Sequence, residues 1–378
     1  MIIRETHLKQ KHAGIQTTLY AIRQRYWILD GRNQVRKILR ACIRCFRFRV
    51  NEIQYMMAKL PKSRVNVSRP FENVGMDFCG PFHIKEKKYR NRAFIKVYVC
   101  VFICMSVKAV HLEVVGDMTT DGFLAAFRRF ISRRGVPKNC FSDNGLNFVG
   151  AKNDLEELYN LLNSDEHKTE IEHFSIDHKI KWNFIPPLAP HFGGLWESTV
   201  KQFKHHFKRV AGNLTLNFEE LNTLVTEIEA ILNSRPLTPL SSDPNDIVVL
   251  SPAHCLIGQP MTKLPESDWT TTPSNRLSVW QHITKVRQHF WQRWRLEYLN
   301  ELQQRQKWTK GGSNLEVGTL VLLKDRNAPC MQWPMGRVTE IHPGDDGIVR
   351  TATVKTATGE SKRSVKLLSV LPIEKDSD

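Results

Sequence analysis

The stretch Pro186–Gly212, PPLAPHFGGLWESTVKQFKHHFKRVAG, joins a segment that breaks regular structure to one with a helical pattern. Its prolines and the pair Gly193-Gly194 interrupt helices and strands. The run that follows carries one acid and three lysines on a shared helix face, namely Glu197, Lys201, Lys204 and Lys208. An adjacent apolar stripe, which predicts a buried face, consists of Trp196, Val200, Phe203 and Phe207.

Two interpretations fit this predicted helix. An acid followed by lysines is common on ordinary exposed helices, where the side chains form ion pairs. The same arrangement also suits an acid that binds a metal ion beside lysines that bind phosphates. Acidic residues upstream, at Asp77 and Asp143, favour the second interpretation.

The charge of the chain is concentrated at its two ends. The 378 residues carry 55 Lys and Arg against 38 Asp and Glu, a formal net charge of +17. Residues 1–50 contribute +10 and residues 276–378 contribute +6, so the part between them is nearly neutral. This distribution indicates basic modules that bind a polyanion on either side of a central body.

Cysteine content and hydropathy exclude several classes of protein. Eight cysteines in a chain of this length do not make a disulfide scaffold, and the N-terminus lacks the apolar run of a signal peptide. The apolar run Val97–Val107 is too short to cross a bilayer, so we expect no membrane partner. Cys100 and Cys104 are expected to be buried as small apolar residues. An intracellular, reducing setting follows.

A short basic segment at the N-terminus has the residues of a zinc site. His7 and His12 precede the pair Cys42 and Cys45. A cysteine pair alone is more often a redox pair or incidental, but zinc prefers four nitrogen and sulfur ligands in a tetrahedron. We therefore expect residues 1–60 to form a zinc-binding domain. Its single Zn²⁺ is structural, because four protein ligands leave no position for water.

Residues 65–240 predict an α/β domain in which helices pack on a mixed sheet. The strands alternate with helical stretches after an initial run of three strands. In chain order the predicted elements are strands at 71–82, 93–104 and 107–115, a helix ending at 134, a strand at 139–142, a helix at 152–163, a strand at 181–185, and helices at 194–212 and 217–233.

Three acids occupy suggestive places in this pattern. Asp77 lies inside an apolar strand, where an acid costs free energy unless it is paired or bound to a metal. Asp143 follows a strand and Glu197 begins a helix, so each taken alone fits an ordinary turn or surface residue. Carboxylates that converge repel one another unless cations neutralise them. Two Mg²⁺ or Mn²⁺ ions suit such oxygen ligands and the chemistry of phosphoryl transfer.

The chain resembles the integrase region of a retrotransposon polyprotein, most closely of the BEL/Pao group. The resemblance covers most of the chain. It is carried by the His, His, Cys, Cys module and by the motifs GMDFCGPF, SDNGLNFVGAKNDL, PPLAPHFGGLWESTVKQFKHHFKRV, LNSRPLTPLSSDPND and QWPMGRVTEIHPGDDGIVR. It implies an RNase H-like core, and 3′-end processing and strand transfer of element DNA into target DNA. The catalytic acids implied are Asp77, Asp143 and Glu197.

The sequence departs from the retroviral pattern in one respect. Asp143 and Glu197 are separated by 53 residues, which is longer than the retroviral spacing. We expect the polar run Asn163–Ile180 to be a surface insertion that leaves the three acids unaffected. The protease and reverse-transcriptase regions of such an element are absent, so the chain fits either a fragment of an element or a domesticated copy.

Several residues near the acids are candidates for DNA binding. Lys201, Lys204 and Lys208 are expected to contact phosphates. Asn144 follows Asp143 in a turn and is a candidate for the same surface. His191 precedes the Gly193-Gly194 pair and fits either a DNA contact or an exposed loop residue.

The C-terminal third predicts a linker, a long helix and a small β domain. Residues 241–246 and 260–273 have the composition of linkers, and 277–308 has a helical pattern rich in aromatic residues. These aromatic residues fit self-association or packing on the core. We assign 241–310 to the linker and helix, 311–373 to a domain resembling the SH3-like modules of integrases, and 374–378 to an acidic tail.

Three functions remain open at this level. The first is an active integrase that acts as a homo-multimer on DNA in the nucleus after synthesis in the cytoplasm. The second is a domesticated DNA-binding or assembly protein without catalysis. The third is a nuclease that does not join strands. The complete set of acids favours an active enzyme.

Overall fold

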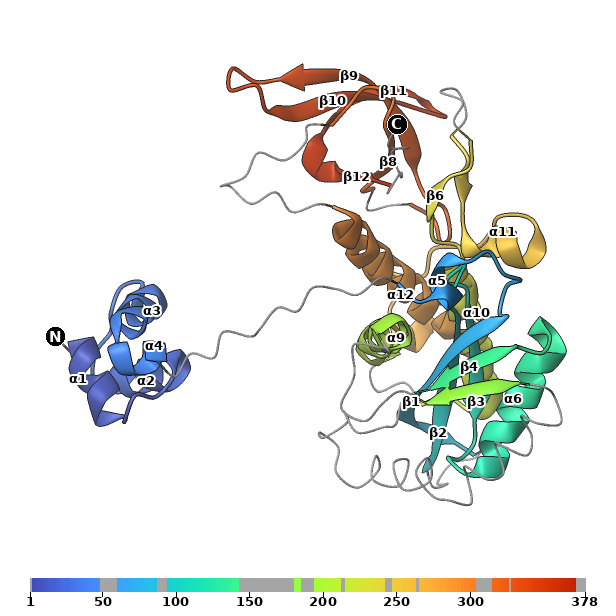
Figure 1. Ribbon diagram of the computed structural model, residues 1–378, viewed down its shortest axis with the longest axis horizontal. Coiled ribbons are helices and arrows are strands. Elements are labelled where there is room, and N and C mark those ends of the chain that lie inside the picture. Colours follow the sequence, from blue (N-terminus) through green and yellow to red (C-terminus); the bar gives the residue numbers. More distant parts are fainter. Residues whose placement is uncertain are drawn as a thin grey trace. The chain divides into compact units, whose positions relative to one another are not determined.

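The computed structural model describes residues 2–47, 60–86, 94–142, 180–184, 194–211, 215–241, 247–262, 265–303, 315–325 and 328–371. The chain divides into two units, residues 1–60 and 61–378, and Figure 1 labels the helices and strands of each. Among the described residues, no helix combines the length and low polarity that a membrane span requires.

The N-terminal unit consists of four short helices around a very small apolar core. The helices are α1 (Ile2–Lys9), α2 (Ile15–Arg23), α3 (Gly31–Ala41) and α4 (Ile43–Arg47). The buried apolar residues are Ile3, Leu19, Ile22, Val35 and Leu39. A core of this size provides little stability by itself, so the unit needs a further source of stability.

A five-stranded mixed sheet organises the second unit. Its strands are β1 (Asn73–Lys85), β2 (Phe94–Cys104), β3 (Val110–Val115), β4 (Asn139–Ser142) and β5 (Lys181–Phe184). The spatial order is β3-β2-β1-β4-β5. The strands β1, β2 and β3 are antiparallel neighbours, whereas β1, β4 and β5 run parallel. This is the RNase H-like mixed sheet that the sequence predicts.

Helices cover both faces of this sheet (Figure 1). On one face, α6 (Thr120–Arg134) packs through Phe127 and Phe130 against Phe102 of β2. On the other lie α9 (Gly194–Ala211) and α10 (Phe218–Asn233). Alternate residues of β2 therefore enter two different cores, which explains why its sequence is apolar throughout. Cys100 and Cys104 are buried in the α6 core, as expected.

The helix boundaries follow from capping residues that the sequence supplies. Thr119 accepts a hydrogen bond from the Gly122 N–H at the start of α6, and Asn217 forms a capping box with Glu220 at the start of α10. Both devices satisfy N–H groups that have no partner inside the helix.

A glycine in β1 allows α9 to pack closely on the sheet. A Cβ atom added at Gly75 would lie 2.3 Å from Cε3 of Trp196, which is only 1% exposed and has no room to move away. Further along the same two elements, the rings of Phe82 and Phe207 are 4.9 Å apart. The start of α9 is therefore fixed against the middle of β1.

Replacing Gly75 by alanine is expected to destabilise the second unit by about 1–3 kcal/mol, because overpacking forces the helix away from the sheet. Chemical denaturation followed by tryptophan fluorescence measures the change. Gly116→Ala is a matched control, since a Cβ atom there meets no atom within 4 Å. Equal stability of the two variants would show that α9 accommodates the methyl group.

The C-terminal part contains a long helix and a second sheet. The short elements before them are β6 (Thr238–Pro239), β7 (Val249–Leu250), α11 (Pro252–Ile257) and the 3-10 turn Ser274–Arg276. A further short helix, α5 (Lys62–Val65), precedes β1. The long helix is α12 (Val279–Leu302). The sheet comprises β8 (Leu320–Leu323), β9 (Met335–Pro343), β10 (Val349–Thr356), β11 (Gly359–Ser364) and β12 (Leu368–Val370), with a 3-10 turn at Val365–Leu367.

This second sheet has the order β11-β10-β9-β8-β12 and is curled into a half-barrel, with β11 and β12 at its edges. The PGDDG sequence at 343–347 joins β9 to β10, as its turn signal predicts. The hairpin between β10 and β11 was not predicted, because Gly359–Ser364 is polar and largely exposed.

Residues 265–273 do not behave as a free linker. Glu266 pairs with Arg287 of α12, and Gln288 of the same helix accepts a hydrogen bond of 2.9 Å from the Trp269 N–H. The Pro, Ser and Thr content that predicts a linker does not reveal such side-chain partners. Three aromatic residues of α12, namely Phe290, Trp291 and Trp294, lie in the same core as α9 and α10, whereas Trp280 is exposed.

Candidate zinc and catalytic sites

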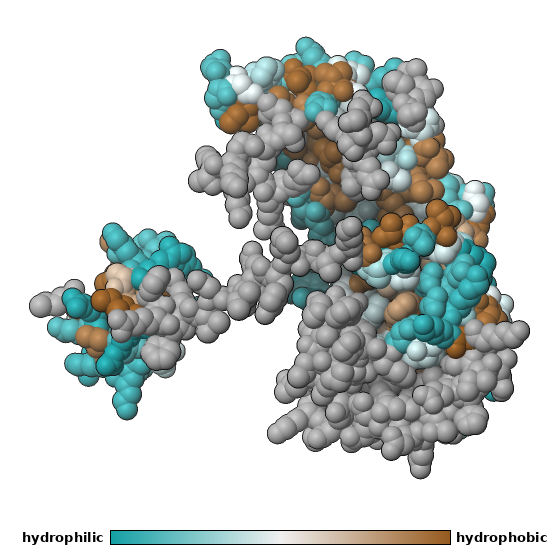
Figure 2. All heavy atoms as spheres, in the orientation of Figure 1, coloured by the Kyte–Doolittle hydropathy of each residue, from teal (hydrophilic) through white to brown (hydrophobic). Residues whose placement is uncertain are grey.

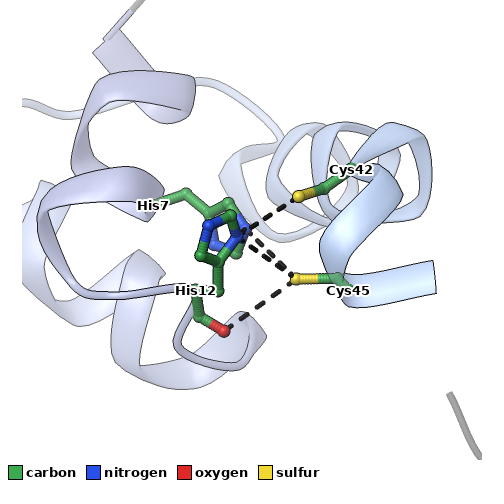
Figure 3. A group of neighbouring side chains, drawn as sticks. All are labelled: His7, His12, Cys42 and Cys45. Carbon is green, nitrogen blue, oxygen red and sulfur yellow. Dashed lines mark hydrogen bonds between the residues drawn. The ribbon is translucent and has the colours of Figure 1, made fainter. Parts of the chain in front are cut away.

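Four side chains of the N-terminal unit converge as the zinc motif predicts (Figure 3). His7 lies on α1, His12 follows its end, Cys42 ends α3 and Cys45 lies on α4. One ligand atom from each residue lies within 4.8 Å of all the others. The Sγ atoms of Cys42 and Cys45 are each 3.3 Å from a histidine nitrogen, and the two histidine nitrogens are 3.2 Å apart.

These separations fit a tetrahedral zinc ion. With Zn–N near 2.1 Å and Zn–S near 2.3 Å, the edges of the tetrahedron measure about 3.4–3.8 Å, close to the separations of 3.2 and 3.3 Å. Burial, and then the neighbouring His12, lower the pKa of His7, which favours the neutral imidazole that a metal requires. A hydrogen bond from the Cys45 backbone lowers the pKa of the Cys42 thiol, which favours the thiolate. The donor set therefore suits a structural Zn²⁺ with no open position.

Asp77 lies in the middle of β1, opposite Val101 of β2, and is 9% exposed. Its Oδ1 atom accepts a hydrogen bond of 2.7 Å from the Phe78 N–H. Burial raises the pKa of Cys79 to about 12, and the charge of Asp77 acts in the same direction while Lys204 and Lys208 oppose it. The electrostatic influence of α9 thus extends to the part of β1 that carries Asp77.

Glu197 lies in the first turn of α9 and is partly exposed. Its neighbour Trp196 packs on Gly75, two residues before Asp77. The structure therefore brings the start of α9 to the segment of β1 that carries Asp77. The strand β4 approaches the same segment, because Ser142 at its end pairs with Met76. Asp143, Asn144 and His191 lie outside the described residues.

The basic stripe of α9 is largely exposed. Lys201 and Lys208 are exposed and Lys204 is half-buried, whereas the adjacent apolar stripe is buried as predicted. One contact of α9 was not predicted: His206 Nε2 lies 3.0 Å from an oxygen of Glu297 on α12. Nothing in the sequence pairs these residues, since they are 91 positions apart.

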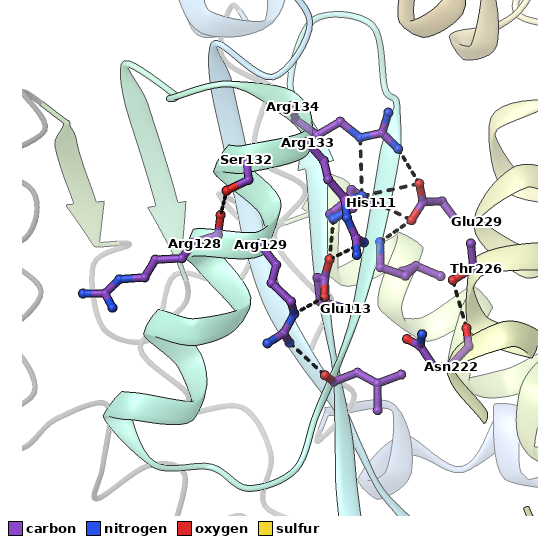
Figure 4. Close-up of polar contacts among 12 residues, drawn as sticks. His111, Glu113, Arg128, Arg129, Ser132, Arg133, Arg134, Asn222, Thr226 and Glu229 are labelled. Atoms are coloured by element: carbon purple, nitrogen blue, oxygen red, sulfur yellow. Dashed lines mark hydrogen bonds and ion pairs between the residues drawn. The ribbon is translucent and has the colours of Figure 1, made fainter. Parts of the chain in front are cut away.

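A network of charged residues that is buried at His111 and Glu113 links β3, α6 and α10 (Figure 4). Nε2 of His111 lies 3.0 Å from Glu113, and Nδ1 lies 3.3 Å from Glu229. Arginines of α6 complete the pairs, with Arg129 and Arg133 on Glu113 and Arg134 on Glu229, at 2.6–2.8 Å. The network is structural, and sequence reasoning missed it because its members come from three separate elements.

The network makes stability depend on pH. Burial opposes the charge of His111, and so does Arg134, but hydrogen bonds to Glu113 and Glu229 outweigh both and raise its pKa. A histidine whose pKa is higher in the folded protein stabilises the fold while it is protonated. This stabilisation is complete below the unfolded pKa near 6.5 and is lost as the pH rises through the folded pKa. The contribution of His111 is therefore expected to decline above neutral pH.

His111→Gln is expected to lose about 2 kcal/mol of stability at pH 6, because hydrogen bonds to charged groups contribute about that much. Denaturation of both proteins at about pH 6, 7 and 8.5, in and above the range where His111 loses its proton, tests the sign of the pH dependence. The difference between wild type and variant should shrink as pH rises. A difference that is constant or grows would contradict the protonated state of His111.

Comparison with known proteins covers both ends of the chain. Residues 1–51 match the integrase zinc-binding domain, and residues 278–371 match a family of unknown function, DUF5641. No curated protein matches the chain.

Solved structures of retroviral proteins are similar at low identity. A chain of the simian T-cell lymphotropic virus intasome, solved with PP2A regulatory subunit B56 gamma, has 14% identity and a TM-score of 0.36, with 99% of this chain and 100% of that chain covered. The HTLV-2 integrase catalytic core domain in complex with magnesium, in dimeric and trimeric forms, has 21% and 20% identity and TM-scores of 0.28 and 0.29. These cover 44% and 46% of this chain and 88% and 91% of theirs.

Proposed function

We propose that this protein is a retroviral-type DNA integrase of the BEL/Pao group, a polynucleotidyl transferase that processes 3′ ends and joins them to target DNA. The observation that carries the proposal is the meeting of three elements at one segment of β1. Asp77 lies on that segment, α9 with Glu197 begins against it, and β4 ends beside it. The integrase zinc-binding match at residues 1–51 supports the same function.

The third acid of the proposal is Asp143, which the sequence places directly after β4. Ser142 is the last residue of β4 and pairs with Met76, the neighbour of Asp77. Asp143 is the next residue, and consecutive Cα atoms are about 3.8 Å apart. We assign the third carboxylate to Asp143 because this residue directly follows β4 in the sequence, and its own position lies outside the described residues. Together with Asp77 and Glu197, a carboxylate from Asp143 would supply three hard oxygen ligands.

Such a set suits Mg²⁺ or Mn²⁺, with Asp77 and Asp143 holding one ion and Asp77 with Glu197 a second. When bound, two ions lower the pKa of the attacking hydroxyl and neutralise charge that develops on the phosphate. The protein's own contribution is to fix the three acids on rigid elements. A carboxylate on a central strand and another on a helix docked to that strand move little relative to each other.

The DNA strand is held by the basic stripe that starts beside Glu197. Lys201 and Lys208 are exposed on the outer face of α9, and Lys204 is half-buried. Phosphate contacts of this kind position DNA without reading its sequence. Asn144 and His191 are assigned to the same surface from their places in the sequence. The proposal includes assembly as a homo-multimer on DNA and action in the nucleus.

Incubation of the full-length protein with a labelled oligonucleotide bearing a 3′-hydroxyl, supercoiled plasmid and Mg²⁺ tests this function. An integrase joins the labelled strand to the plasmid in a metal-dependent reaction, so the label appears in plasmid-length product. Plasmid nicking without label transfer would identify a nuclease instead. DNA binding with neither nicking nor joining would identify a domesticated binding protein and overturn the proposed activity.

A further inference from the structure

The loop between α2 and α3 exposes large apolar side chains, although the core of this unit contains only a few buried apolar residues. Trp27 is 79% exposed, Leu29 is 84% exposed and Tyr26 is 49% exposed. Between them, Ile28 packs against the core of the unit. Ile28 thus holds the loop to the core, whereas Tyr26, Trp27 and Leu29 are exposed. Packing in the core therefore does not account for the apolar side chains at these three positions.

The surroundings of Trp27 are strongly basic. The guanidinium carbon of Arg23 lies 5.2 Å from the centre of the Trp27 ring, and Arg25 and Arg32 are exposed nearby in the sequence. Asp30 is the one acid between residues 6 and 47, and it accepts a hydrogen bond of 2.7 Å from Asn33. Figure 2 shows hydrophobic residues among hydrophilic ones on this unit. We call Arg23, Tyr26, Trp27 and Leu29 the Trp27 surface.

Charge and shape together select the ligand. A positive surface of this kind favours a polyanion over a second copy of the same basic unit, which it would repel. A flat indole beside a guanidinium provides a stacking partner for a nucleobase and a cation for its phosphate. In a duplex the base faces are covered by neighbouring bases, so a ring on a protein surface reaches them only where bases are unpaired.

We propose that the Trp27 surface binds single-stranded nucleic acid, with the Trp27 ring stacked on an unpaired base and Arg23 at the adjacent phosphate. This site goes beyond the proposed integrase activity and involves none of its acids. It gives the N-terminal unit a selective preference for frayed or unpaired strands over intact duplex.

Binding of a labelled oligo-dT strand of about 15 nucleotides to the full-length protein, in buffer without Mg²⁺, tests the proposal. Trp27→Ala is expected to weaken binding roughly 10-fold to 100-fold, as loss of one stacked base does. The slope of affinity against salt should stay unchanged, because no phosphate contact is removed. Trp27→Phe should recover most of the affinity, and binding to a duplex of equal length should change less than about 2-fold.

Trp280→Ala is the matched control, since Trp280 is 50% exposed on α12 in the other unit and its loss should leave affinity unchanged. Zinc content and light scattering of the same samples complete the test. Unchanged oligo-dT affinity of Trp27→Ala, or an equal loss on duplex, would overturn the proposal. A lower molecular mass of the variant would identify the surface as a contact between copies and also overturn it. Failure of strand joining would not affect any of these outcomes.

Discussion

Asp77→Asn is expected to lower strand joining by roughly a thousandfold or more. Under the proposed function Asp77 is the ligand shared by both metal ions, and each ion contributes several kcal/mol to the transition state. Each 1.36 kcal/mol corresponds to a factor of ten in rate, so weakening both ions removes most of the acceleration. Asp143→Asn is also expected to abolish strand joining, because it removes a ligand of one of the two ions.

The fold and the binding of DNA should survive the Asp77→Asn change. Asparagine has the same shape as aspartate, and its carbonyl oxygen can still accept the hydrogen bond from the Phe78 N–H. Three measurements are made on the same preparation: product formation on a sequencing gel, DNA binding by fluorescence anisotropy, and the melting temperature. Asp121→Asn, an exposed acid in the first turn of α6, serves as the control and should keep full activity. Joining by Asp77→Asn at the wild-type rate would remove Asp77 from the catalytic set.

The elements that the sequence predicts well are those whose signals are local. The strand at 139–142 is followed by polar residues in the sequence, and the helix from 194 has one apolar stripe, so both appear where their patterns place them. The zinc ligands are likewise predicted from spacing, because zinc accepts few donor types. Local signals of this kind determine which elements form and roughly where they end.

Contacts between distant elements could not be predicted in the same way. Glu113 and Glu229 come together only after β3, α6 and α10 have packed, and Arg134 differs from any other surface arginine only by that packing. The same holds for Gly75, whose importance depends on Trp196 lying over it. A one-residue change in the register of β1 would move Asp77 to the other face of the sheet, and no motif fixes that register. Asp143 remains a prediction, since it lies outside the described residues.

Removal of zinc is expected to unfold the N-terminal unit while the second unit stays folded. Five buried apolar residues form its core, and binding of structural zinc contributes about 10–16 kcal/mol in small domains of this type. Without the ion, the imidazoles and thiolates that converge at 3.2–3.3 Å lose the partner that holds them together. Each of the helices α1, α2 and α3 is shorter than an isolated helix needs to be in water, so only the small apolar core would hold them once the ion is removed.

Hydrogen exchange of the full-length protein before and after chelation measures this result residue by residue. Backbone amides of α2 and α3 should exchange at the rate of an unfolded chain in the chelated protein, whereas those of β1 and β2 keep their protection. Cys42→Ser should reproduce the loss without chelator, because a hydroxyl does not replace the thiolate. Cys255→Ser, which changes a half-buried cysteine of the second unit, should leave zinc content and exchange unchanged. Protected amides in α2 and α3 after complete removal of zinc would mean that the small core is sufficient to fold the unit.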